Sequence, residues 1–73
     1  MNPDEVRVRC LLLFGDQAEI VADVPAEDRA EPVRYPAAEI AAAVGLEARE
    51  LPGRALMARV GPGDRLSGWR LAQ

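Results

Sequence analysis

The sequence predicts a small α+β domain in which a mostly antiparallel sheet of four to five strands carries one short helix packed on one face. Two apolar runs of strand character lie close together near the N-terminus, and two more surround a Pro-Gly pair near the C-terminus. Between these pairs lies an alanine-rich segment with the apolar spacing of a helix. The 73 residues are expected to form one domain spanning 1–73, because a chain of this length builds a single limited core.

The first pair of runs, residues 6–14 and 18–24, is expected to form a β-hairpin with a loop of about three residues. Pairing Phe14 with Ala18 places apolar residues of both runs on one face, whereas a slip by one residue would bury carboxylates there. Cys10 falls on that apolar face, so it is expected to be a small core residue rather than a reactive thiol.

Three apolar side chains fall on the opposite face of this hairpin, where solvent is expected. Leu11 and Val21 pair across the strands in this register, and Leu13 lies next to them. A contiguous apolar trio on a sheet is a candidate interaction surface. Two arrangements would cover it: a symmetric homodimer, or a sheet that curls until the second hairpin closes over it. The homodimer is the preferred prediction, with Arg9 and Asp23 paired at its rim.

The helix is predicted to begin at Pro36, which suits the first helical position, and to end at Gly45, which suits a left-handed C-cap. Ile40 and Val44 form its apolar stripe, and the alanines around them allow close contact with a sheet. Residues 25–32, before the helix, are polar and bounded by prolines, so a surface loop is expected there, followed by a brief extended stretch.

A second hairpin is expected from residues 54–60 and 66–72, so the predicted order of elements is ββαββ. This order is similar to that of the β-grasp arrangement, a likeness of element order that implies no function. The edge strands of such a sheet are expected to remain available for pairing.

The loop of the second hairpin is rich in glycine, a composition also found in loops that bind phosphates. Gly63 and Gly68 have the spacing of the Walker A glycines, but a Trp-Arg pair follows where that motif needs Lys and then Ser or Thr. The dinucleotide-binding pattern fails as well. Pro62 and Gly63 instead fit the central positions of a type II turn, so both are predicted to be structural.

The residue inventory argues against catalysis. The chain has no His, no Lys and no Thr, one serine (Ser67) and one cysteine, so the usual pairs of nucleophile and base are absent. We therefore expect no enzymatic activity, no catalytic residue, no metal site and no cofactor. Glu27, Asp28 and Glu31 match no metal-binding loop and are expected to be solvated.

No apolar run reaches membrane-spanning length, and the acidic N-terminus does not have the pattern of a signal peptide. A cytoplasmic protein without membrane contact is expected. The single cysteine excludes an internal disulfide.

Charge is divided unevenly along the chain. Residues 1–48 have a net charge of −6, and residues 49–73 have a net charge of +3. This asymmetry predicts an arginine-bearing face near Arg59 and Arg70 beside an acidic rim, which would suit a protein partner of mixed charge. The alternative is that the fold interleaves the two halves and evens out the surface charge.

Protein interaction is the leading function class: a non-catalytic accessory or regulatory module whose partner is a protein of unknown identity or a second copy of itself. One alternative is a small-molecule binder with an apolar pocket between sheet and helix. Another is nucleic-acid binding through a local arginine patch, which the net charge of −3 and the scarcity of aromatic residues disfavour. The candidate residues of the interaction surfaces and the turn are Leu11, Leu13, Val21, Arg59, Arg70, Pro62 and Gly63.

Overall fold

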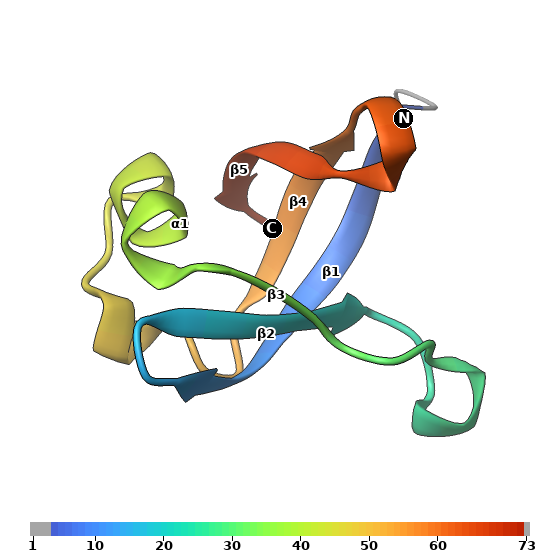
Figure 1. The fold of residues 1–73 in the computed structure, drawn as a ribbon, viewed down its shortest axis with the longest axis horizontal. Helices are drawn as coiled ribbons and strands as arrows, with labels where there is room; N and C mark the ends of the chain where they lie inside the picture. The colour runs from blue at the N-terminus through green and yellow to red at the C-terminus, as the bar shows by residue number, and fades with distance from the viewer. Residues whose placement is uncertain (1–3, 73) are drawn as a thin grey trace.

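The computed structural model describes residues 4–72, which form one antiparallel five-stranded sheet and one α-helix (Figure 1). The strands lie side by side in the order β3-β2-β1-β4-β5. The main elements are β1 (Glu5–Phe14), β2 (Gln17–Ala22), β3 (Val33–Pro36), α1 (Ala37–Val44), β4 (Ala55–Val60) and β5 (Leu66–Leu71). Three short 3-10 helices lie in the loops: η1 (Ala26–Asp28), η2 (Ala48–Glu50) and η3 (Pro62–Asp64). The predicted α+β class and antiparallel sheet are confirmed.

The predicted order ββαββ is wrong, because the chain forms a third strand before the helix. This strand, β3, pairs antiparallel with β2. It has four residues, which is too short a run to show the alternation that identifies a strand in a sequence. The likeness to the β-grasp arrangement depended on the ββαββ order and does not hold.

The connection through α1 returns β4 to the side of β1, so the first four strands form a Greek key. The sheet curls strongly (Figure 1). Tyr35 of β3 joins the two edge strands, β3 and β5. Its hydroxyl accepts a hydrogen bond from the Leu66 N–H of β5 at 3.1 Å, and its ring meets the Trp69 ring edge-on, with 5.1 Å between centroids. Side-chain contacts thus take the place of a backbone ladder. The result is a curled five-stranded sheet whose two edge strands meet through side chains and are not joined by a ladder.

The core lies inside the curl of the sheet. Its largest fully buried side chains are Ile40, Leu51, Leu56 and Cys10. The helix α1 packs against β5, β3 and β2, and it covers one end of the curled sheet rather than a flat face. It ends at Val44 and is capped by Gly45, whose φ of 74° belongs to the left-handed region and lets Leu46 N–H reach the Ala41 carbonyl oxygen.

The first hairpin is present, but its register and its loop differ from the prediction. Phe14 pairs with Gln17, so the loop has two residues rather than about three. Gly15 leads this loop with a φ of 61°, the positive value that the first central position of a type II′ turn requires.

A β-bulge at Leu11 changes which side chains of β1 face the core. The register with β2 shifts between Cys10 and Leu12, which leaves Leu11 as an extra residue. An extra residue reverses the alternation of the strand beyond it. Leu13 therefore packs against the core, whereas Leu12 and Phe14 are exposed.

The second hairpin contains a bulge as well. Gly68 and Trp69 of β5 both lie opposite Ala58, because the register with β4 shifts there. Gly68 has a φ of 60°, which a residue with a side chain rarely adopts. Beyond the bulge Leu66 faces the interior, opposite Val60.

Candidate binding cleft

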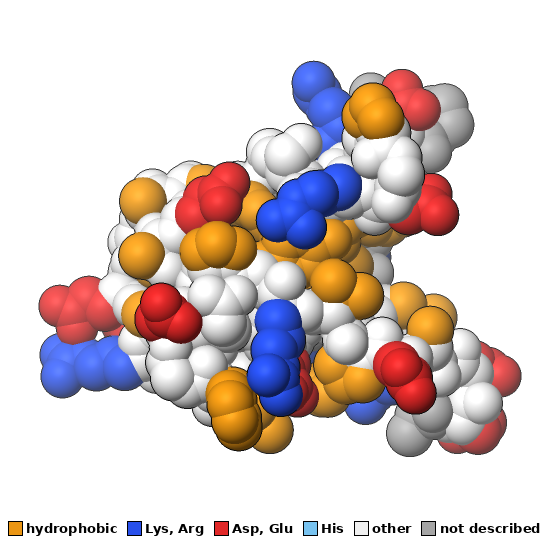
Figure 2. Space-filling model, viewed as in Figure 1, with side chains coloured by type: hydrophobic (Ala, Val, Ile, Leu, Met, Phe, Trp, Pro, Cys, Tyr) orange, Lys and Arg blue, Asp and Glu red, His pale blue; other side chains and the backbone are white. Residues whose placement is uncertain are grey.

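An apolar cleft of about 400 Å³ opens between the loop that contains η1 and the η3 turn. These two segments lie at the end of the curled sheet away from α1 (Figure 1). Figure 2 shows the molecule hollowed there, with hydrophobic side chains along the hollow. Every strand contributes to the lining. The large apolar residues are Val6 and Val8 of β1, Ile20 of β2, Val33 of β3, Val60 of β4 and Leu66 of β5.

The cleft exists because no backbone ladder joins β3 to β5. Tyr35 holds the two edges together and is 4% exposed. Val33 lies two residues earlier on the same face of β3, yet it is 51% exposed, because nothing in the described chain covers it. Deeper in the cleft, Val8 and Ile20 are buried members of the core. The cleft is therefore an uncovered continuation of the core.

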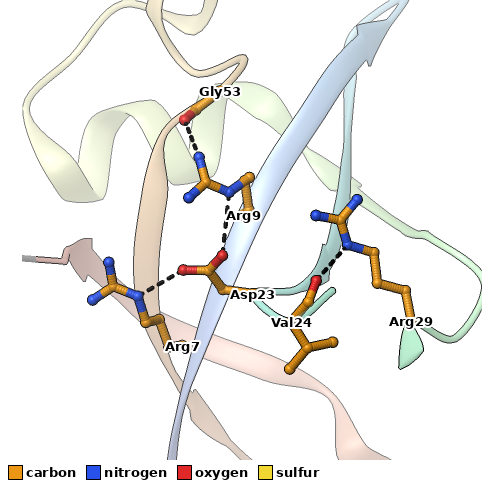
Figure 3. A network of polar contacts seen from close by, with 6 residues as sticks. All are labelled: Arg7, Arg9, Asp23, Val24, Arg29 and Gly53. Atoms are coloured by element: carbon orange, nitrogen blue, oxygen red, sulfur yellow. Dashed lines mark hydrogen bonds and ion pairs between the residues drawn. The ribbon is translucent and has the colours of Figure 1, made fainter. Parts of the chain in front are cut away.

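Three charged residues also line the cleft: Arg7, Glu31 and Asp64. Arg7 is engaged, since its Nε lies 2.6 Å from the Asp23 carboxylate. Within residues 4–72, neither the Glu31 nor the Asp64 carboxylate takes part in an ion pair. Arg29, on the same loop as Glu31, donates through Nε to the Val24 carbonyl oxygen (Figure 3). The charges available to a ligand at the lining are therefore negative.

The Arg7 side chain belongs to a network on the outer face of the sheet (Figure 3). Arg9 binds the other carboxylate oxygen of Asp23 at 3.2 Å and donates through Nη1 to the Gly53 carbonyl oxygen at 2.8 Å. The hydrogen bond from Arg7 lowers the pKa of Asp23, and Arg9 adds to this effect against the opposing effect of partial burial. The network ties β1 to the end of β2 and to the segment before β4. Its arrangement indicates a structural role.

The apolar trio predicted on the first hairpin is not brought together. Leu13 is turned toward the core by the bulge at Leu11, and Val21 is buried opposite Arg9. Of the three side chains only Leu11 is exposed, at 36%. The exposed apolar residues at this end of β1 are instead Leu11, Leu12 and Phe14. The surface on which the homodimer prediction rested is therefore absent in the predicted form.

Arg59 and Arg70 do lie on a common face, the outer face of the sheet. Arg59 lies opposite Glu5 in the register of β4 with β1, and Arg70 of β5 binds the Glu5 carboxylate through Nη2 at 2.8 Å. Both arginines are exposed and neither lines the cleft. The two positive charges thus flank one negative charge on a side of the sheet separate from the cleft.

The predicted turn lies at the mouth of the cleft. Asp64 N–H donates to the Gly61 carbonyl oxygen, which closes a turn with Pro62 and Gly63 at its centre, and Gly63 has a φ of 68°. Asp64 follows with a φ of 61°, an unusual value for a residue with a side chain. The turn places Asp64 on the lining of the cleft.

Two kinds of reactive site were considered from the sequence: a cysteine thiol and a cluster of metal-binding side chains. Cys10 is buried, and desolvation raises the pKa of its thiol, which disfavours the reactive thiolate form. No group of three or more metal-binding side chains in the described part of the chain could hold an ion. No helix among the same residues is long and apolar enough to cross a membrane.

Comparison of the chain with protein-family models, with curated proteins and with solved structures finds no match.

The position of the cleft was not predicted from the sequence, from which a pocket was expected between sheet and helix. One signal for it was present: Val33 is an isolated apolar residue directly after the acidic loop. Its partners in the cleft come from four other strands, so only the tertiary structure shows that they meet.

Proposed function

We propose that this protein is a non-catalytic interaction module that binds a segment of a partner protein in the apolar cleft. The observation that carries the proposal is that Val33 is exposed at a cleft whose lining includes the buried core residues Val8 and Ile20. Apolar surface gains about 25 cal/mol for each Å² removed from water, so a ligand that covers this wall is stabilised by burial alone. The polar groups of the cleft support binding better than catalysis, because Arg7 and the Tyr35 hydroxyl are already engaged within the fold.

A small apolar molecule is the second candidate ligand. The volume of about 400 Å³ lies within the range of about 300–1,000 Å³ that is typical of small-molecule sites. This alternative keeps the same site and the same absence of catalysis. It differs from the leading proposal only in the nature of the occupant.

The site itself can be tested with Nile red, an uncharged fluorophore that brightens in apolar surroundings. The wild-type protein should give a saturable rise in fluorescence. Val33→Asp places a charge in the apolar wall and should weaken binding by about tenfold or more, since burying an unpaired charge costs well above 1.4 kcal/mol. Val33 is half exposed, so the variant should remain folded by circular dichroism.

Val24→Asp is the matched control, because Val24 is an exposed valine that does not line the cleft. It should bind Nile red as the wild type does. The proposal fails if the wild type shows no saturable binding, or if both substitutions reduce binding to the same extent.

A further inference from the structure

Resting on the proposed function, we propose that the ligand is a short segment of a partner protein that carries apolar side chains beside a lysine or arginine. The apolar side chains would enter the cleft and contact Val33, Leu66 and their neighbours. The basic side chain would lie at the mouth, against the carboxylates of Glu31 and Asp64.

The preference for a basic ligand follows from the charges that the fold leaves unpaired. Glu31 reaches the lining from the loop before β3, and Asp64 reaches it from η3, so the two carboxylates belong to separate walls. Of the nearby positive charges, Arg7 binds Asp23, and Arg65, which does not line the cleft, has its guanidinium 5.0 Å from the centre of the Tyr35 ring. An acidic segment would meet like charges on both sides, which lowers its affinity and its rate of association.

The loop that carries Glu31 strengthens this preference. Residues 25–32 hold three carboxylates and one arginine, and that arginine is hydrogen-bonded to the backbone of Val24. The whole chain has a net charge of −3. The field at the mouth of the cleft therefore attracts a cationic partner and repels a second copy of this chain.

The partner is expected to bind through side chains rather than as an added strand. Ala37 N–H donates to the Asp16 carbonyl oxygen, so these two residues are a hydrogen-bonded pair at the end of the β2–β3 ladder. Because hydrogen-bonded pairs alternate along an antiparallel ladder, this contact fixes which residues of β3 turn their N–H and C=O groups toward β2. In that alternation the backbones of Val33 and Tyr35 point toward β2, and those of Arg34 and Pro36 point toward the open edge. Pro36 has no N–H, so β3 offers a partner strand a single donor.

The opposite edge, β5, also has one donor that is already engaged. The Leu66 N–H of β5 already donates to the Tyr35 hydroxyl. Each side of the gap therefore lacks a donor that a ladder would use, and apolar side chains are expected to be the larger source of binding energy.

The ligand can be found with a displayed library of random ten-residue peptides. Selection uses immobilised wild-type protein, with removal of every peptide that also binds Val33→Asp. The retained peptides should combine two or more large apolar residues with at least one lysine or arginine. Labelled with fluorescein, they should bind the wild type in an anisotropy titration and bind more weakly as salt is raised.

The charge requirement is tested with the double variant Glu31→Gln/Asp64→Asn. It should weaken peptide binding by about three- to tenfold, the size expected for two exposed ion pairs, while Nile red binding stays unchanged. The matched control is Glu27→Gln/Asp28→Asn, which removes two carboxylates of the same loop that do not line the cleft. Its effect on peptide binding should be clearly smaller.

Four results would overturn the inference, and they differ in what they imply for the proposed function. Retained peptides without basic residues, or equal effects of the two double variants, remove the charge requirement and leave the cleft as a protein-binding site. Nile red binding without any retained peptide favours a small molecule. A molar mass by light scattering that rises with concentration in the wild type, but not in Val33→Asp, identifies the occupant as a second copy.

Discussion

The hydroxyl of Tyr35 links the edge strands β3 and β5 by accepting a hydrogen bond from β5, and Tyr35→Phe removes this hydroxyl while keeping the ring. In the wild type the hydroxyl accepts from the Leu66 N–H at 3.1 Å, and the ring contacts Trp69 edge-on. The phenylalanine ring can keep the contact with Trp69 and the position of the Arg65 guanidinium over its face. The substitution therefore isolates the hydrogen bond from the packing.

The expected loss of stability depends on the Leu66 N–H, which is left without its acceptor in Tyr35→Phe. An unsatisfied buried donor costs about 1–3 kcal/mol. Leu66 is partly buried and lines the cleft, so water can reach its N–H, which places the loss near the lower end, at about 1 kcal/mol. For a domain of this size such a loss lowers Tm by about 4–8 °C.

Urea unfolding followed by Trp69 fluorescence measures this loss as a lower midpoint with an unchanged slope. Amide hydrogen exchange gives a local readout, because the Leu66 amide should lose protection once its acceptor is gone. Tyr35→Leu, which removes both hydroxyl and ring, should cost distinctly more. An unchanged midpoint in Tyr35→Phe, together with unchanged exchange at Leu66, would show that the phenol does not hold the two edges together.

Three further predictions concern other parts of the fold. Gly63→Ala should lower Tm through the cost of a left-handed backbone alone, about 1–2 kcal/mol, because no atom lies within 4 Å of the added Cβ; a thermal melt equal to the parent would contradict this. Asp23 has a lowered pKa in the folded state, so its stabilising effect is present above its unfolded pKa of about 3.9 and is lost as the pH falls through the lower folded value. Urea midpoints of the wild type and Asp23→Asn should therefore differ at pH 7 and converge toward pH 2, and a constant difference would argue against the ion pairs. Leu13→Asp should destabilise the fold strongly and Leu11→Asp only slightly, as judged by urea unfolding, and the reverse order would disprove the bulge in β1.

The features that the sequence determined by itself are those that depend on neighbouring residues. The helix runs over Ala37–Val44, one residue after the predicted start, and Gly45 has the left-handed C-cap conformation. These features follow from backbone rules that act within a few residues, such as the fixed φ of proline and the freedom of glycine. The tertiary contacts add to them without changing them.

The faces of the strands were predictable only up to the bulges. In the first half of β1 the alternation holds, and Val8 and Cys10 lie in the core as expected. Beyond Leu11 one extra residue reverses it, which turns Leu13 inward and separates the predicted trio. The sequence did not reveal this position, because no glycine or proline marks it and every residue from Cys10 to Phe14 is apolar.

The cleft was decided by the tertiary structure alone. β3 becomes a strand only through its pairing with β2, and the curl of the sheet then sets the distance between β3 and β5. Val6, Val33 and Leu66 are far apart in the sequence, and each of them fits an ordinary core strand when considered alone. Whether such residues are covered depends on how far the sheet closes, which is the sum of many pairings and twists rather than the property of any one segment.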